Sequence, residues 1–205
     1  MKTFNTFKFH TSKSLLLLMA IFLLVIAAGC NKKDSAIESL KKQNIAASAD
    51  SLSGFSNKGD LATVKLLLEA GVDVNAQDSQ GSTALREASW AGKQEVVSYL
   101  LDAKADVNSP SSAKFTALSA AISQKQVAIA LLLLEHGANP NVVDPGGSTP
   151  LIEAVWQGSL PLVKALLAKG AAPNYKRPDS GFTALKAAGN KADIVQALKA
   201  AGATE

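Results

Sequence analysis

Apolar positions return along most of the chain at an interval of 33 or 34 residues. Each interval holds a short stretch rich in alanine, then a polar break, then a stretch with two adjacent leucines. These pairs are Leu67-Leu68, Leu100-Leu101, Leu133-Leu134 and Leu166-Leu167. The spacing favours two short helices per interval. One such pair cannot bury its own apolar face, so the pattern predicts a stack of units.

Polar and small residues mark where these helices should begin and end. A threonine followed two residues later by leucine precedes each alanine-rich stretch, and its hydroxyl can cap exposed helix amides. An alanine five residues later lets neighbouring helices approach closely, and a glycine such as Gly71 can end the second helix. The threonines are Thr83, Thr116, Thr149 and Thr183; the alanines are Ala88, Ala121, Ala154 and Ala188; the asparagines that close the units are Asn75, Asn108, Asn141 and Asn174.

This register resembles the ankyrin repeat, whose unit is a turn followed by two antiparallel helices. Most of the family's pattern is present in GSTALREASWAGKQEVVSYLLDAKADVN and in GSTPLIEAVWQGSLPLVKALLAKGAAPN. The resemblance covers residues 45–205 and implies an all-α solenoid of about five stacked helix-turn-helix units joined by β-turn or hairpin loops. The expected units are residues 45–77, 78–110, 111–143, 144–177 and 178–205.

Two departures from the family pattern affect the expected detail. In the third unit SPSSAK replaces the usual turn and Lys104 replaces a glycine, so we expect an irregular loop there. In the last unit Lys199 stands where a leucine is expected, which favours a polar end to the stack.

Residues 1–29 predict an export signal. A basic start is followed by the fourteen-residue apolar run LLLLMAIFLLVIAA, which is short for a membrane span and suits a signal peptide. The run ends in Ala27-Ala28-Gly29, directly before Cys30, the only cysteine of the chain. The segment resembles a bacterial lipoprotein signal, which implies removal of residues 1–29 and lipidation of Cys30. An ordinary cleaved signal followed by an incidental cysteine is the alternative.

Residues 30–44 are polar and charged, and we interpret them as a lipidated N-terminus and a tether. Ser35 and Glu38 have the spacing of a capping box, so a short helix could begin there. A coil of this length spans about 20 Å, which would hold the repeats close to the membrane. The resemblance also favours the outer membrane, facing the periplasm, because Asn31 stands where an aspartate typically retains such proteins in the inner membrane.

The charged and metal-ligating residues argue against several classes of function. Three lysines and no acid precede residue 30, so of the net charge of +4 only about +1 (4 − 3) belongs to the rest, which gives no footprint for nucleic acid. His136 is the only histidine after residue 29, so no zinc cluster or Cys–His pair is expected. Glu87 and Glu153 share a repeat position but should lie on the order of 20 Å apart, too far for paired catalysis. We expect no enzyme activity, no cofactor, no metal and no small-molecule substrate.

Two tryptophans point to a binding surface. Trp90 and Trp156 each follow a repeat threonine by seven residues, which places both at the end of a first helix. In the ankyrin family, variable residues there and at the turn tips line the concave partner-binding face, and so does the residue before each threonine. Tryptophan is also enriched in binding hot spots. The predicted surface comprises Trp90, Phe115, Trp156 and Phe182, with Gln80, Gln124 and Gln157 between them. In the alternative, each tryptophan fills a gap between helices.

These observations favour a membrane-anchored ankyrin-repeat scaffold that binds a protein partner in the bacterial cell envelope through its concave face. An inhibitor or immunity protein against an exported toxin is one alternative. A purely structural envelope lipoprotein, with the repeats as a spacer, is another.

Overall fold

The computed structural model describes residues 31–204 of the chain. The expected export signal and Cys30 therefore lie outside the described residues. Within residues 31–204, the structure contains no helix with both the length and the apolar character needed to cross a bilayer.

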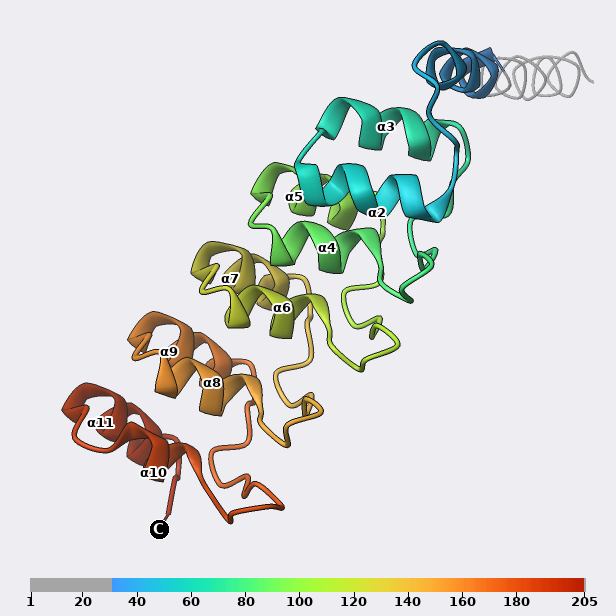
Figure 1. Ribbon diagram of the computed structural model, residues 1–205. Coiled ribbons are helices and arrows are strands. Elements are labelled where there is room, and N and C mark those ends of the chain that lie inside the picture. The colour runs from blue at the N-terminus through green and yellow to red at the C-terminus, as the bar shows by residue number, and fades with distance from the viewer. Residues whose placement is uncertain (1–30, 205) are drawn as a thin grey trace, which may run out of the picture.

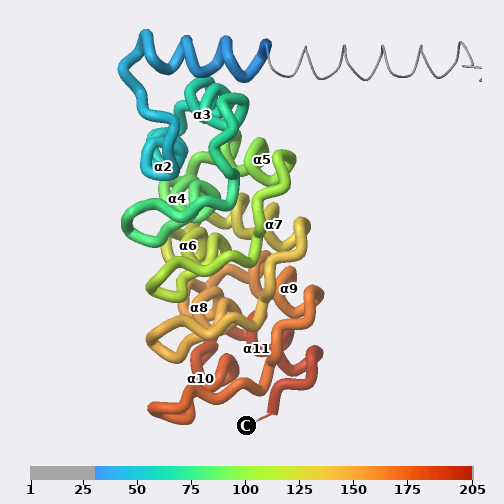
Figure 2. The backbone as a smooth tube through the Cα atoms, turned by 90° about the vertical axis from the view of Figure 1, so that its right-hand side faces the viewer, coloured from blue at the N-terminus to red at the C-terminus, as the bar shows by residue number. Residues whose placement is uncertain are grey.

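Ten helices form five antiparallel pairs that stack in one direction (Figure 1). The first helices of the pairs form one layer, and the second helices form another beside it (Figure 2). The turns between units extend from the side of the first layer. The pairs are α2 (Ala49–Lys58) with α3 (Leu61–Glu69), α4 (Ala84–Trp90) with α5 (Gln94–Asp102), α6 (Ala117–Ser123) with α7 (Val127–Glu135), α8 (Pro150–Trp156) with α9 (Leu160–Ala168), and α10 (Ala184–Ala188) with α11 (Ala192–Ala200). The predicted all-α solenoid is confirmed.

The repeat threonines cap the first helices as the sequence predicts. Each hydroxyl accepts a hydrogen bond from the amide three residues later, as Thr83 does from Arg86 at 3.3 Å. The first unit has no such threonine, and Ser48 takes the same role by accepting from the Ser51 amide at 3.2 Å. A cap of this kind contributes about 1 kcal/mol, which matters for helices of only seven residues.

The seam between units is made of alanine and leucine. Ala88, Ala121 and Ala154 are completely buried, and so are Leu100 and Leu133 of the second helices. All belong to one continuous apolar cluster that runs through the units. A residue larger than alanine at the first-helix positions would force the helices apart.

An asparagine ladder joins the ends of the units. Asn108 accepts a hydrogen bond from the Asn139 amide at 2.8 Å and donates to the Gly137 carbonyl at 3.1 Å, both in the next unit. Asn141 and Asn174 repeat the contact, down to the Thr204 amide at the end of the stack. The asparagine that closes each unit is therefore a clamp onto its successor.

The turn of the third unit is regular, so the expected irregular loop is wrong. Ser111 replaces the aspartate found at Asp78, and its hydroxyl accepts the Phe115 amide at 3.2 Å, as Asp78 accepts the Ser82 amide. Lys114 takes the place of Gly81 with a φ of 60°. Lys104 likewise adopts the left-handed conformation of the glycine it replaces, with a φ of 68°. The left-handed conformation costs a residue other than glycine about 1 kcal/mol. Backbone hydrogen bonds from the two lysine amides, to the Leu101 and Ser111 carbonyls, help to hold it.

Residues 31–42 form a helix that lies across the first unit (Figure 2). The sequence predicts a polar tether over residues 30–44, with a short helix that could begin at Ser35. The observed helix also includes residues 31–34. Ala36 and Leu40 are 2% and 1% exposed and belong to the apolar cluster of the repeats. The two residues lie four apart, on one face of the helix. Their burial covers the apolar end of the stack, and the charged residues of the segment face solvent.

This covering role gives a direct test. Leu40→Ala is expected to lower the free energy of unfolding by about 2–4 kcal/mol, because it removes a fully buried side chain at the end of the stack. Lys41→Ala, on the exposed face of the same helix, should change it by less than about 0.5 kcal/mol. Urea melts followed by circular dichroism measure both, and equal small changes would show that this helix does not contribute to the core.

Candidate partner-binding surface

Both tryptophans lie on the surface at the ends of their helices. Trp90 is 43% exposed and Trp156 is 40% exposed. The neighbouring seam positions are filled by small residues, as Ala88 and Ser89 show at the end of α4. The helices are therefore packed by small side chains, and the tryptophans are not needed to fill a gap between them.

The ring of Trp156 is held by Arg177, at the end of its own unit, and by Phe182 of the next unit. Its centroid lies 5.9 Å from that of Phe182, and the guanidinium of Arg177 lies over it at 5.5 Å. Arg177 is fixed in turn by Asp179 at 2.9 Å and by the Gly146 carbonyl at 2.6 Å. The hydrogen bonds from Arg177 lower the pKa of Asp179, so the pair stays ionised at neutral pH. This Trp156 cluster (Trp156, Arg177 and Phe182) presents a preorganised aromatic surface.

Trp90 has a simpler environment. The guanidinium of Arg86, one turn earlier on α4, lies 5.9 Å from its ring. Within residues 31–204 no ring contact joins Trp90 to Phe115. The predicted aromatic residues therefore do not form one continuous track. Trp156 and Phe182 come together, and Trp90 stands apart.

The remaining predicted residues differ in their exposure and in their contacts with the rest of the chain. Gln80 and Gln124 are exposed. The amide of Gln157 donates to the Ile122 carbonyl of the preceding unit at 2.6 Å, so this side chain ties α8 to α6. Phe115 is half-buried and lines a pocket beside the same helices.

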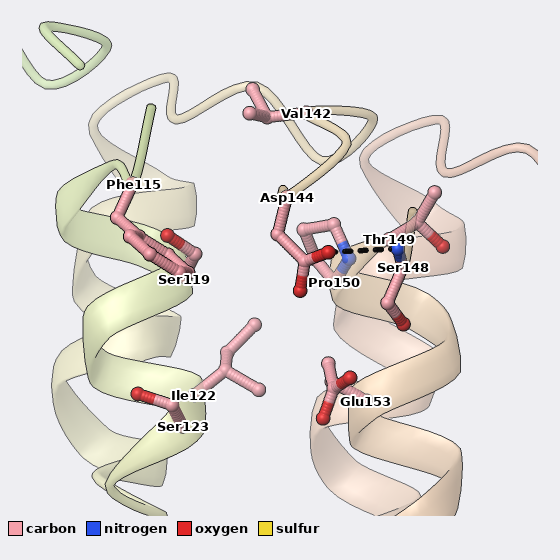
Figure 3. Close-up of a pocket in the computed structure, with 10 residues that line it drawn as sticks. All are labelled: Phe115, Ser119, Ile122, Ser123, Val142, Asp144, Ser148, Thr149, Pro150 and Glu153. Carbon is pink, nitrogen blue, oxygen red and sulfur yellow. Dashed lines mark hydrogen bonds between the residues drawn. The ribbon is translucent and has the colours of Figure 1, made fainter. Parts of the chain in front are cut away.

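This pocket lies between α6 and α8 and has a volume of about 150 Å³ (Figure 3). Phe115 and α6 form one wall, and α8 with its preceding turn forms the other. Its lining residues are Phe115, Ser119, Ile122, Ser123, Val142, Asp144, Ser148, Thr149, Pro150 and Glu153. Drug-sized ligands occupy roughly 300–1,000 Å³, so the pocket fits one side chain better than a free metabolite.

The charged residues of the pocket lining, Asp144 and Glu153, are both acidic. Burial is the main reason why the pKa of Glu153 is raised. The nearby Asp144 carboxylate raises it further, whereas Ser148 and Arg177 act in the opposite direction. Asp144 is held in place because one of its oxygens accepts the Ser148 amide at 2.8 Å (Figure 3).

The corresponding site two units earlier is filled by the chain itself. There Glu87 accepts a hydrogen bond from Asn57 of the preceding unit at 3.1 Å and another from the Ser82 hydroxyl at 2.8 Å. Arg86 also forms an ion pair with it. The carboxylate of this first site is therefore fully partnered.

The pocket at Glu153 lacks those partners. Ser123 stands at the position of Asn57, and the buried Ile152 stands at that of Arg86. The Ser148 hydroxyl is close enough to Glu153 to favour its ionised form. The oxygen is nevertheless buried and has no hydrogen bond of normal geometry. Sequence reasoning compared Glu87 with Glu153 only as a catalytic pair. The residue thirty positions before each glutamate, Asn57 or Ser123, would have indicated whether its carboxylate is partnered by the preceding unit.

The described part of the chain contains no group of side chains that meets the requirements of a metal site. Among residues 31–204, no three His, Cys, Asp or Glu side chains are grouped so that they could hold a metal ion. His136 is exposed at the C-terminal end of α7.

The stacked helix pairs and their capping threonines define a repeat solenoid of the kind that binds other proteins. Three overlapping segments, residues 24–111, 45–144 and 118–204, match the family described as ankyrin repeats (3 copies), and the chain belongs to this family. No curated protein sequence matches the chain significantly. Ankyrin-repeat proteins are generally protein-interaction scaffolds without enzyme activity.

Glu87 and Glu153 should respond in opposite ways to neutralisation. Glu87→Gln is expected to lower the free energy of unfolding at pH 7 by about 1–2 kcal/mol, because it disrupts a fully partnered carboxylate. Glu153→Gln should raise it, because the raised pKa shows that the fold disfavours the ionised form.

The gain in Glu153→Gln should depend on pH. A raised folded-state pKa penalises folding above that pKa, and the penalty vanishes below the ordinary glutamate value of 4.5. The advantage over wild type should therefore be present at pH 7 and absent near pH 4 in urea melts. A loss of stability at pH 7 comparable to that of Glu87→Gln would contradict this assignment.

Proposed function

We propose that the protein is a scaffold that binds a protein partner through the face formed by its first helices and turns. The observation that carries the proposal is the exposure of both tryptophans at the same repeat position. Large exposed aromatic rings are uncommon on a surface that serves only as a spacer, and they are enriched at the centres of protein interfaces.

The Trp156 cluster supports this proposal through its rigidity. Phe182 of the next unit and Arg177 hold the ring in place, so little side-chain entropy is lost when a partner covers it. Trp90 supplies a second contact two units away. A partner that touches both must extend along the stack, which favours a protein over a small molecule.

We further propose that Cys30 anchors the protein to a membrane of the bacterial cell envelope, with the repeats in the periplasm. The support is the apolar run that ends in a lone cysteine. Residues 31–42, which follow Cys30 in the sequence, form a helix that packs on the first unit. A lipid on Cys30 would therefore join the stack through a packed helix and not through a free tether.

Partner binding should depend on the tryptophans more than folding does. Trp90→Ala and Trp156→Ala are each expected to weaken partner capture by about 2–4 kcal/mol, as hot-spot truncations do. Cross-linking in intact cells followed by mass spectrometry identifies the partner, and a binding titration with that partner gives the loss. Lys164→Ala, on the exposed face of α9, is the matched control and should leave capture unchanged.

The same variants separate a binding role from a structural one. The free energy of unfolding should fall by about 1–2 kcal/mol in Trp156→Ala, which loses the ring pair and the cation, and by less in Trp90→Ala. A buried tryptophan would cost about 3–5 kcal/mol. The free protein should show the red-shifted fluorescence of hydrated indole, moving to the blue on binding. Capture that is unaffected in both variants would contradict the proposal and favour the spacer.

The anchor has its own test. Cells grown with labelled palmitate should label the wild-type protein and not Cys30→Ser, because the thiol is the acceptor of the lipid in the lipoprotein class that the signal resembles. Membrane fractionation should show the variant released. Absence of label in the wild type, or a soluble form cleaved at another residue, would mean an ordinary signal peptide.

A further inference from the structure

The two sites built around Glu87 and Glu153 have the same backbone and different contents. At Glu87 the carboxylate receives the Asn57 amide from the preceding unit, and Arg86 adds a positive charge. At Glu153 the same two positions hold Ser123 and Ile152, which cannot supply either donor. The second site thus keeps the carboxylate and the serine of the first, with Ser148 in the place of Ser82, and lacks its amide and guanidinium donors.

Three features of this pocket indicate which chemical group could bind in it in place of the donors found at Glu87. Glu153 and Asp144 both line it, so the missing group should be positively charged. The Ser148 hydroxyl, in a residue only 2% exposed, makes no hydrogen bond of normal geometry, although it lies near Glu153, and Ser148 lines the same pocket. The aromatic ring of Phe115 forms the opposite wall (Figure 3). A planar guanidinium can lie on an aromatic face while its N–H groups reach carboxylate oxygens, which an ammonium group does less well.

We propose that the pocket between α6 and α8 receives an arginine side chain of the protein partner. The inference rests on the proposed function, since it names the chemistry that the partner must present. The volume of about 150 Å³ fits one guanidinium group and part of its stem. The position also fits, because Trp156 follows Glu153 on α8 by three residues, so an arginine in the pocket lies beside the Trp156 cluster.

The nearby positive charge of the chain does not occupy this site. Arg177 is stacked on Trp156 and is hydrogen-bonded to Asp179 and to the Gly146 carbonyl, and it is not among the residues that line the pocket. Its guanidinium therefore borders the site and leaves the pocket open to an arginine from outside.

The test uses the full mature chain and a defined probe. N-acetylarginine amide is titrated against the ¹⁵N-labelled protein, with N-acetylcitrulline amide as the uncharged probe of nearly the same shape. The arginine probe should shift the amide resonances of residues 148, 149 and 151–153 saturably, and the citrulline probe should bind at least about tenfold more weakly. Equal responses to the two probes would overturn the proposal.

Two variants and one control locate the binding. Glu153→Gln should weaken the arginine probe by about tenfold or more, because it removes the charge that the guanidinium pairs with. Ser123→Asn recreates the donor that Asn57 supplies at the first site, so it should fill the pocket, weaken the probe similarly and raise the melting temperature. Glu135→Gln, which neutralises an exposed carboxylate outside the pocket, should keep binding within about twofold. Arginine binding that survives both Glu153→Gln and Ser123→Asn would place the probe elsewhere and sink the proposal.

Measurements on the captured partner distinguish this inference from the proposed function. Glu153→Gln should weaken partner capture by about tenfold. If the tryptophan variants lose capture and Glu153→Gln does not, the arginine pocket is wrong while the scaffold role stands. If the wild type binds the arginine probe and cross-links to no partner, the scaffold role is wrong while the preference of the pocket for arginine stands.

Discussion

Close approach between neighbouring helix pairs is the constraint on which this structure depends. A unit of two short helices buries too little apolar surface to be stable alone, so each must lie directly on the next. The completely buried alanines of the first helices set that distance, and the leucines of the second helices fill the space that remains. The asparagine ladder then fixes the ends of the units at the same spacing. Helix 31–42 serves the same requirement, because it covers the one apolar face that has no preceding unit.

The candidate binding residues lie at repeat positions outside the seam of alanines and leucines that packs the units together. Units two and four carry Ser, Glu and Trp at three of these positions, and units three and five carry Phe, Ala and a small polar residue. The chain thus alternates between two kinds of unit. The alternation places a tryptophan before a phenylalanine at two junctions, but only Trp156 meets its phenylalanine. Of the two glutamate sites, only the one at Glu153 is open, because Asn57 and Arg86 fill the one at Glu87. The candidate binding features are therefore properties of junctions and not of single units.

The sequence predicted the fold well because the repeated residues have local roles. Thr83 caps a helix and Ala121 sits at a seam whatever lies beyond the neighbouring unit, so periodicity alone locates them. The sequence-based prediction failed where the role of a residue depends on contacts that the repeat pattern does not contain. Nothing in SPSSAK shows that Ser111 can replace an aspartate. In helix 31–42 the two residues buried in the apolar cluster, Ala36 and Leu40, stand among charged residues, so the apolar face is hard to recognise in the sequence. The sequence also could not show that Gln157 is engaged while Gln124 is free, because that depends on a carbonyl 35 residues away.

The last unit is the place where the stack should fray. Its first helix, α10, has only five residues, and within residues 31–204 it packs mainly against α8 and α11. Yet Phe182 and Arg177, which hold Trp156, both belong to this end of the chain. Local opening of the terminus would therefore release the ring, and a partner seated on the ring would suppress the opening. Binding and terminal order are thermodynamically linked here, and amide hydrogen exchange in α11 would respond to a partner that never touches that helix.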